Sequence, residues 1–285
     1  DGVMLKPFAA LGVKAVGMDP ASNVVKSVEA KGFTIVDDFF GEATARDVKK
    51  YHGAFDAVVS SYSFAHIDDM MGVMAGVKHI LKDDGVLVFE VYYLGTLMDE
   101  MQYDMVYHEH LNYYSLHTLQ LFLKRYGMEI FDVTFTPGVR SVAVRFCARN
   151  IGMRTEPITQ AVVQMEQEEK KKGFDRADIF LDYGRKVEAT KQQLLGLLSQ
   201  LKKEGKTIIG YGASGRGTTI MNYCGIDNTY LDYVVDDAPA KHGFYTPGTH
   251  VVIQPWTYIE QEGTYPDYAL LFAWSFMKEV LNKRA

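Results

Sequence analysis

The sequence predicts an α/β protein with two domains, each built on a parallel sheet. Two observations indicate this. In the first half of the chain, short apolar runs typical of strands alternate with amphipathic stretches typical of helices. Near residue 206 the alternation starts again, with an apolar run followed by a glycine-rich turn. A chain of 285 residues is long enough for two domains, which we place at 1–150 and 151–285.

The first domain is expected to alternate strands with helices. An amphipathic helix over 3–11 leads into a strand that ends on Asp19, which is the second half of a nucleotide-binding βαβ unit. The first strand and most of the glycine turn of such a unit do not precede it, so we expect the chain to be a fragment cut inside that turn. The predicted strands are 14–19, 33–36, 55–61 and 85–93, and the predicted helices lie near 22–31, 43–51 and 69–82.

The middle of the chain predicts a hairpin and then helices. Two strand-like runs, 128–135 and 141–146, flank a turn at Pro137-Gly138. From about 155 to 204 the chain is charged and helical, and 164–172 is most simply a solvated helix face. Leucines at helical spacing over 175–203 predict a helix that packs the two domains together.

A second α/β unit is expected from residue 206 onward. A strand at 206–209, the glycine turn Gly210–Gly217, a helix start at Thr218 and a strand at 230–235 follow one another. Glycines let the backbone approach a ligand closely, and a helix N-terminus offers N–H groups to an anion. The turn therefore predicts a phosphate site, and the alternative is a unit that has lost its ligand. A last strand is expected at 267–274.

Composition excludes several classes of function. A net charge of −6 at pH 7 gives no basic field for nucleic acid or an anionic membrane. We find no apolar run long enough to span a membrane and no signal peptide. The two cysteines, Cys147 and Cys224, are far apart, which favours a reducing, cytoplasmic compartment and offers no metal spacing.

The run Tyr107-His108-Glu109-His110 is the strongest candidate for catalysis. It places two imidazoles, a carboxylate and a phenol just past the strand-like run 86–91. Burying such groups is costly unless they pair or do chemistry. His66 follows another strand-like run, and loops after strands are where ligands bind in open α/β sheets. Both loops are therefore predicted to belong to an active site.

These motifs resemble one family over essentially the whole chain, the S-adenosylmethionine-dependent C-methyltransferases of deoxysugar-nucleotide biosynthesis, of the NDP-4-keto-deoxyhexose C-3-methyltransferase type. The resemblance rests on Asp1-Gly2, 17–20, 64–67, 107–115, 210–214, 235–243 and 247–250. It implies that 1–150 is a class I, Rossmann-like methyltransferase domain lacking its first strand. It also implies that 151–285 is a helical linker and a second Rossmann-like domain. The zinc of such proteins belongs to an N-terminal domain that this sequence does not contain, so no metal ligands are assigned.

The resemblance implies methyl transfer to the carbon beside the ketone of a 4-keto sugar nucleotide. A base removes the proton at that carbon, and the resulting enolate attacks the sulfonium methyl group of S-adenosylmethionine. His110 is the expected base, because an imidazole suits this task near neutral pH. Glu109 is expected to orient an imidazole or hold the substrate, and Tyr107 and His66 to donate hydrogen bonds to the enolate oxygen. His108 is expected to be structural.

The resemblance also implies binding residues for two small molecules. For S-adenosylmethionine, Asp19 is expected to accept the ribose hydroxyls, Asp1 and Gly2 to border the methionine part, and Asp38 and Phe39 to meet the adenine. For the diphosphate of the nucleotide sugar, the candidates are Ser214, Arg216 and Lys241.

The sequence departs from the family pattern at three points. Residues 137–142 replace a His-Gly-Gly-Ser-x-Arg motif, and Tyr62 stands where an asparagine is common. Arg216 replaces a lysine of the glycine loop and keeps its positive charge. The first two changes lie near the expected substrate or cofactor surface, so they bear on which substrate is used.

Three alternatives stay open on the sequence. An NAD(P)-dependent oxidoreductase using Gly210–Gly217 would explain Asp236, 26 residues after Gly210, as a ribose-binding acid. A metal enzyme would use His108, Glu109 and His110 as ligands. A non-catalytic fragment would follow from loss of the first strand, which removes ladder partners from its neighbours. On that last ground the chain alone is expected to be poorly stable and to bind S-adenosylmethionine weakly.

Overall fold

The computed structural model describes residues 2–136, 143–263 and 265–284, and the chain divides into two compact units. Unit 1 comprises Asp1–Glu90, Thr118–Val133 and Arg145–Val162, and unit 2 comprises Val91–His117, Thr134–Val144 and Val163–Ala285. Each unit combines three separate stretches of chain. The division into domains at residue 150 stays a prediction.

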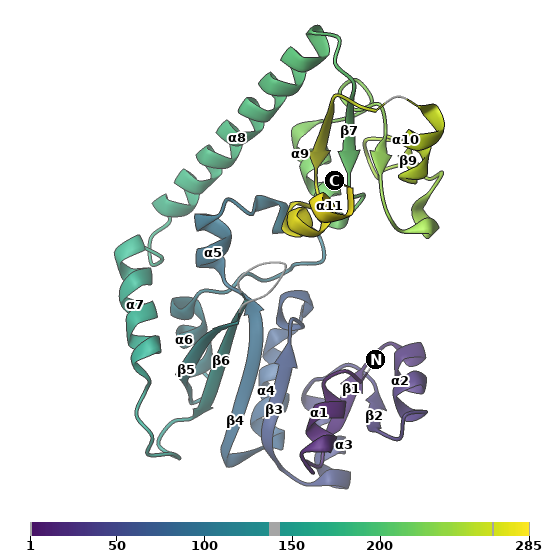
Figure 1. Ribbon diagram of the computed structural model, residues 1–285. Coiled ribbons are helices and arrows are strands. Elements are labelled where there is room, and N and C mark those ends of the chain that lie inside the picture. The colour runs from purple at the N-terminus through teal and green to yellow at the C-terminus, as the bar shows by residue number, and fades with distance from the viewer. Residues whose placement is uncertain (1, 137–142, 264, 285) are drawn as a thin grey trace. The chain divides into compact units, whose positions relative to one another are not determined.

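Strands and helices alternate along unit 1, as the apolar periodicity predicts (Figure 1). Each predicted element is present, with its ends shifted by a few residues. The strands are β1 (Val16–Asp19), β2 (Thr34–Asp37), β3 (Phe55–Ser61) and most of β4 (Leu81–Tyr92). The helices are α1 (Leu5–Ala10), α2 (Ser22–Glu29), α3 (Glu42–His52), the short 3₁₀ helix η1 (Phe64–His66), α4 (Met70–Ile80) and most of α6 (Leu116–Lys124).

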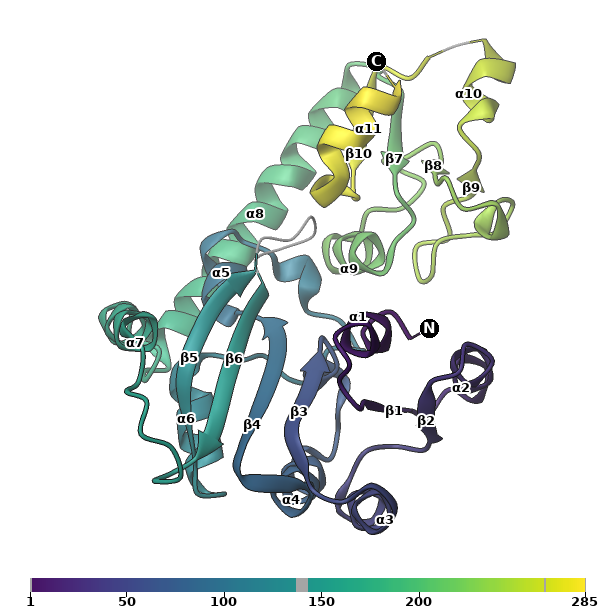
Figure 2. The same cartoon turned by 60° about the horizontal axis from the view of Figure 1, so that its bottom comes forward.

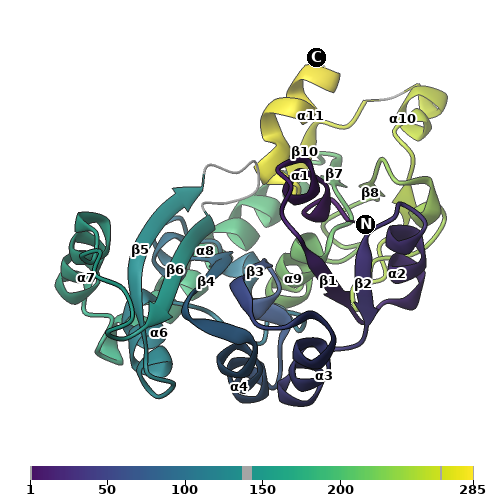
Figure 3. The same cartoon turned by 90° about the horizontal axis from the view of Figure 1, so that it is seen from below.

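Among the described residues, the six strands β1 to β6 form two sheets. One is the parallel pair β1–β2, in which Asp19 lies opposite Asp37, so both strands end at the same edge (Figure 3). The other has the order β3-β4-β6-β5, with β5 (Met128–Thr136) and β6 (Ala143–Asn150) side by side (Figure 2). The neighbouring β5 and β6 agree with the predicted hairpin. Its predicted turn at Pro137-Gly138 lies outside the described residues, as does all of 137–142.

Aromatic packing on β4 forms the centre of the larger sheet's core. Phe89 is fully buried, and its ring stacks on Phe64 at 4.8 Å and on Phe146 at 5.5 Å between centroids. Such pairs add to the stabilisation that comes from burying apolar area. The packing fixes the position of β4, whose carboxyl end leads into the segment with the histidine cluster.

Two helices follow the hairpin, where a long charged helical region is predicted. They are α7 (Gln160–Lys172) and α8 (Asp178–Lys203), and Gly173 ends α7 with a φ of +81°, a conformation that favours glycine. That the leucines of α8 pack the two domains together stays a prediction. Leu198 is buried among Ile208 and Met221, so the end of α8 packs on the C-terminal sheet of unit 2.

The C-terminal part of unit 2 is a four-stranded parallel sheet with the order β10-β7-β8-β9. Two predicted strands are shorter than expected: 230–235 contributes two residues to the sheet and 267–274 contributes four. The elements are β7 (Ile208–Tyr211), α9 (Gly215–Cys224), β8 (Val234–Val235), η3 (Pro239–Lys241), β9 (Ile253–Gln254), α10 (Thr257–Glu262), β10 (Tyr268–Leu271), η4 (Trp274–Phe276) and α11 (Met277–Arg284).

Among the described residues, no helix combines the length and apolar character needed to cross a membrane.

Candidate active site

The histidine cluster lies in the segment between α5 (Leu94–Asp99), the short helix that follows β4, and α6. The short 3₁₀ helix η2 (Tyr103–Met105) opens this segment. Its far end returns to β4, because Tyr114 forms a bridge with Tyr93 and its carbonyl accepts the Leu94 N–H at 2.8 Å. The segment is therefore a closed loop at the carboxyl end of a strand, where ligands bind in α/β proteins.

His110 is buried and held by both ring nitrogens. It is 7% exposed, with Nδ1 2.9 Å from the Met105 carbonyl oxygen and Nε2 3.1 Å from the Tyr107 hydroxyl oxygen. A carbonyl oxygen only accepts, so Nδ1 carries the proton and Nε2 accepts from the phenol. We infer a neutral imidazole whose lone pair points at Tyr107.

Tyr107 is the member of this pair that faces the adjoining cleft. Its ring lies against the His110 ring, 4.2 Å between centroids. Burial, and then the nearby Glu109 carboxylate, raise the pKa of Tyr107, while the Arg216 guanidinium opposes the shift. The phenol is therefore protonated at neutral pH and acts as a hydrogen-bond donor.

His108 and Glu109 point outward beside Tyr107. Their side chains are 89% and 61% exposed, and His108 Nε2 lies 4.0 Å from Glu109 Oε1. The Glu109 carboxylate thus lies near the His108 imidazole. His108 itself is an exposed side chain at the cleft.

Tyr107, His108 and Glu109 line a cleft of about 810 Å³ that lies wholly within unit 2. The N-terminal half of α9 forms another wall, and the exposed aromatics Phe244 and Tyr245 lie at its border. The predicted substrate residues Ser214, Arg216 and Lys241 all line it, with Ala213, Gly215, Thr218, Thr219, Asn222, Ala240, Pro247 and Ile253. The structure thus brings together two groups of predicted residues that lie about a hundred positions apart in sequence.

The glycine turn is stabilised by Asp236, which sequence spacing offers as a ribose-binding acid. One oxygen of its buried carboxylate accepts the Ala213 N–H at 2.8 Å and lies 3.0 Å from Lys241 Nζ, and the other accepts the Ala238 N–H at 2.8 Å. Lys241 Nζ also donates to the Ala213 carbonyl at 2.9 Å. Both carboxylate oxygens of Asp236 therefore accept hydrogen bonds from inside the protein. A ribose-binding role for Asp236 was the main support for the oxidoreductase alternative, and these bonds weaken it.

Arg216 has partners that the sequence does not indicate. Its Nε lies 2.7 Å from Asp104 Oδ2, and its guanidinium lies over the Trp274 ring at 4.6 Å. Asp104 is separated from Arg216 by 112 positions, so spacing arguments miss it. The one sequence signal is an acidic residue three positions before the Tyr107 cluster.

The remaining predicted residues lie in unit 1, apart from Asp1, which lies outside the described residues. His66 is the exposed last residue of η1. Asp19 ends β1, and its Oδ1 accepts the Ala21 N–H at 2.8 Å. Asp38 and the 74% exposed Phe39 directly follow β2, and Gly2 has a φ of +76°.

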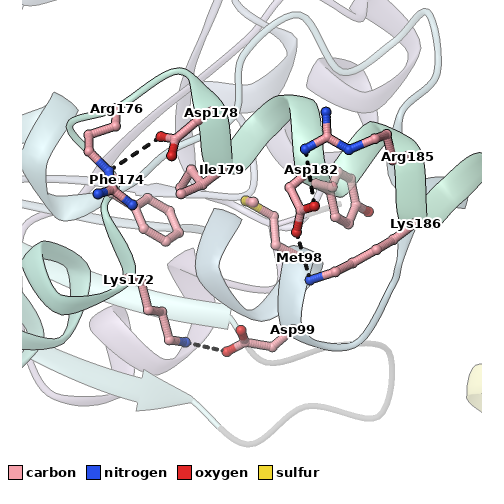
Figure 4. A pocket seen from close by; sticks show the side chains of 11 residues that line it. Met98, Asp99, Lys172, Phe174, Arg176, Asp178, Ile179, Asp182, Arg185 and Lys186 are labelled. Atoms are coloured by element: carbon pink, nitrogen blue, oxygen red, sulfur yellow. Dashed lines mark hydrogen bonds and ion pairs between the residues drawn. The ribbon is translucent and has the colours of Figure 1, made fainter.

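A second hollow in unit 2, of about 500 Å³, lies beside α5, the α7–α8 junction and the start of α8 (Figure 4). Its charged side chains pair with one another: Lys172 with Asp99, Arg176 with Asp178, and both Arg185 and Lys186 with Asp182. We interpret these charged residues as surface ion pairs and not as a binding site. Among the described residues, no group of three or more His, Cys, Asp or Glu side chains is arranged to hold a metal ion.

Comparison with known proteins identifies the fold and the family. A model described as a methyltransferase domain matches residues 1–133, and with the sheets described above it defines the class I, Rossmann-like fold of S-adenosylmethionine-dependent methyltransferases. A model described as the C-methyltransferase C-terminal domain matches residues 141–285, half of the chain. The chain therefore belongs to the C-methyltransferase family.

One curated relative matches nearly the whole chain. The C-methyltransferase NovU of Streptomyces niveus is 29% identical over 281 residues, which are 99% of this chain and 66% of that protein. The chain thus spans about two thirds of the length of this relative, and the activity of a whole protein of this kind is treated below as a proposal.

Solved structures resemble about half of the chain. A SAM-dependent methyltransferase from Archaeoglobus fulgidus is 14% identical, with a TM-score of 0.44, over 52% of this chain and 81% of that chain. The PH0226 protein from Pyrococcus horikoshii OT3 is 13% identical, with a TM-score of 0.42, over 52% and 77%.

Proposed function

We propose that the protein is an S-adenosylmethionine-dependent C-methyltransferase that methylates the carbon beside the ketone of an NDP-4-keto-deoxysugar. The observation that carries the proposal is the Tyr107–His110 pair beside a cleft that charged and hydroxyl side chains help to line. Membership of the C-methyltransferase family supports transfer to carbon. Methylation of carbon requires removal of a proton from a weakly acidic C–H bond, which in turn requires a placed base.

His110 has the features of that base. The Met105 carbonyl holds the proton on Nδ1, so Nε2 is the basic nitrogen. In the reaction, Nε2 takes the proton from the carbon beside the ketone. The electron pair of the broken C–H bond forms a carbon–carbon double bond, and the π pair of the ketone moves onto its oxygen. The Tyr107 hydroxyl turns from Nε2 to that oxygen and stabilises its negative charge. The enolate carbon is then the nucleophile, and His110 returns its proton to water.

Glu109 and His66 have supporting roles in this proposal. The exposed Glu109 carboxylate at the cleft stabilises positive charge on an imidazole or accepts a sugar hydroxyl. His66 follows β3 in unit 1 and is the second candidate donor to the enolate oxygen.

Residues at one edge of the β1–β2 sheet fit S-adenosylmethionine. Asp19 supplies a carboxylate, as a ribose diol requires, and Phe39 supplies an exposed aromatic face, as an adenine requires. Asp19 lies opposite Asp37, and Asp38 and Phe39 follow directly, so these groups share one edge. When bound, S-adenosylmethionine supplies an electrophilic methyl group on a sulfonium. Asp19 would hold the ribose, Asp38 and Phe39 the adenine, and Asp1 and Gly2 the methionine part.

The cleft supports binding of the diphosphate of the sugar nucleotide. Ser214 caps α9 by accepting the Gly217 N–H at 3.1 Å, so the start of this helix, with its partial positive charge, lies at the cleft. Lys241 adds a cation, with two of its three donors used by Asp236 and Ala213. Arg216 adds a second cation, which Asp104 already pairs.

Cofactor binding is tested by calorimetric titration of the full-length protein with S-adenosylhomocysteine, with NADH as a parallel titration. We expect micromolar binding of the first compound, silence with NADH, and about tenfold weaker binding in Asp19→Asn, which loses a charged hydrogen bond. Binding of NADH with no binding of S-adenosylhomocysteine would contradict the proposal.

Proton removal is tested separately from methyl transfer, by exchange of the substrate hydrogen in deuterated water. With an NDP-4-keto-deoxysugar, His110→Gln should slow exchange by about 100-fold or more, because a positioned base contributes that much. Tyr107→Phe should slow exchange less and keep His110 active. His52→Gln, at the end of α3, is the matched control and should exchange normally. Normal exchange in His110→Gln would remove His110 as the base.

A further inference from the structure

Asp104 is a buried carboxylate that joins two parts of the cleft wall. It lies in η2, three residues before Tyr107, and is 3% exposed. Its Oδ2 accepts hydrogen bonds from Arg216 Nε at 2.7 Å and from Trp274 Nε1 at 2.9 Å. All three residues belong to unit 2. A buried charge is costly unless it is paired, so this arrangement has a defined geometry.

Arg216 is held in one orientation by these contacts. Its Nε is bonded to Asp104, and the face of its guanidinium lies over the Trp274 ring at 4.6 Å. A planar guanidinium that is hydrogen-bonded along one edge and stacked on an aromatic ring through one face has little rotational freedom. Since Arg216 lines the cleft, Asp104 determines where this positive charge is placed relative to Tyr107.

The same turn of chain also orients the proposed base. The residue after Asp104 is Met105, whose carbonyl oxygen accepts from His110 Nδ1 at 2.9 Å and from the Tyr113 hydroxyl at 3.3 Å. If η2 moves, that carbonyl moves with it. The proton is then no longer held on Nδ1, and Nε2 is no longer directed at Tyr107.

We propose that Asp104 is the positioning residue of the cleft, which holds Arg216 against Trp274 and, through Met105, keeps His110 in the tautomer with a basic Nε2. The catalytic part of this inference rests on the proposed function, whereas the positioning of His110 does not. Asp104 touches none of the reacting groups and acts through Arg216 and the Met105 carbonyl.

The test is the tautomer of His110 in the Asp104→Asn variant of the full chain, which keeps the side-chain shape and removes the charge. Two-bond proton–nitrogen correlation spectra of the histidine rings report the tautomer, with the His110 signals assigned by their loss in His110→Gln. We expect one tautomer, protonated on Nδ1, in the unaltered protein and a mixture of both in Asp104→Asn. In a methyl-transfer assay the same variant should lower kcat by up to about 100-fold, as expected for a misplaced base, with little change in KM for S-adenosylmethionine.

Asp99→Asn is the matched control. Asp99 is the same residue type at the end of α5, but its exposed carboxylate pairs with Lys172. We expect the His110 spectrum of this variant to match the unaltered protein. A change of equal size in Asp99→Asn would overturn the proposal, because a general loosening of the segment would then explain the effect.

Trp274→Phe provides a second variant should Asp104→Asn fail to fold. It keeps an aromatic ring for Arg216 and removes only the Nε1–H donor to Asp104. We expect a smaller shift in the same direction. An unchanged His110 tautomer in every folded variant would overturn the proposal, whatever the outcome of the methyl-transfer assay.

Discussion

Single buried carboxylates hold the functional segment in place at the residue scale. Besides Asp104 and Asp236, Glu169 in α7 is 2% exposed and accepts the N–H groups of Leu116 at 2.6 Å and His117 at 2.8 Å. The first N–H groups of a helix have no partner within it, so Glu169 caps α6 from a different helix. The segment that carries Tyr107 and His110 ends at this cap.

Replacing Glu169 by alanine should lower the free energy of unfolding by about 3 kcal/mol, because one buried and one half-buried N–H group lose a charged acceptor. Denaturant titration followed by circular dichroism measures the change. Glu168→Ala is the control: it removes the same side chain from the next position of α7, which is exposed, and should stay within about 0.5 kcal/mol of the unaltered protein. Equal effects of the two changes would show that Glu169 is not a cap.

At the element scale, the turn between β7 and α9 depends on close backbone packing. Gly212 has a φ of +97°, a conformation that other residues rarely adopt. A Cβ atom there would lie 2.7 Å from the Ala273 Cβ and 3.1 Å from the Ala273 backbone nitrogen. The turn that carries Ser214 and Arg216 therefore needs glycine at this position for two independent reasons.

Gly212→Ala should destabilise the protein by about 2 kcal/mol or more, through strained backbone and a clash with β10's continuation at Ala273. Gly215→Ala is the control, because nothing lies within 4 Å of the added atom and the backbone there needs no positive φ. We expect the control to change the free energy of unfolding by less than about 0.5 kcal/mol. The measurement is the urea midpoint of unfolding of each variant. Similar midpoints for Gly212→Ala and Gly215→Ala would contradict the argument that Gly212 is required by backbone packing.

At the scale of the whole molecule, unit 2 contains several phenols that are buried or half-buried. Burial is the largest cause that raises the pKa of Tyr93, Tyr103, Tyr114 and Tyr183 above the ordinary 10.0, in the case of Tyr183 to about 12. A raised pKa of a phenol means that the folded state keeps its proton when the unfolded chain has lost it. The stability that these neutral phenols contribute is complete below pH 10.0 and is lost as pH rises through the folded pKa values.

The free energy of unfolding should therefore fall steadily above about pH 10, since folding then holds protons that the unfolded chain releases. Denaturant midpoints across this range, together with tyrosinate absorbance, measure the effect. Tyr114→Phe removes one of the raised groups, whose shift comes from burial alone, and should make the decline shallower. A flat profile in the unaltered protein would contradict the burial of these phenols.

The elements were predictable where the apolar period is long and regular. Strands β1 to β4 and helices α2 to α4 follow the periods of their side chains. The strand expected at 230–235 was predicted too long. At Asp232 the backbone N–H donates to the Ile208 carbonyl at 2.9 Å, but the Ile208 N–H is accepted by the Asp232 carboxylate at 3.1 Å and not by a backbone carbonyl. Helix α6 was missed, and its cap, Glu169, lies 53 positions from Leu116.

The candidate site was predictable in part, for a related reason. Tyr107 and His110 are three positions apart, so the sequence indicates that both belong to one site, whereas the hydrogen bond between them is a finding of the structure. Asp104 and Arg216 are 112 positions apart, and no local pattern reports their contact. The oxidoreductase alternative took Asp236 as a ribose-binding acid. In the structure Asp236 binds the Ala213 N–H, 23 positions earlier in the chain, and no local pattern predicts that contact either.

The sequence by itself determined the alternating α/β order, the place of the histidine cluster after β4 and the glycine turn before α9, since each depends on residues close together in the chain. The tertiary structure alone decided which charges are committed: Arg216 to Asp104, Asp236 to the Ala213 N–H, and Glu169 to the start of α6. Buried charges require partners, and the choice of partner is made by packing between segments distant in sequence.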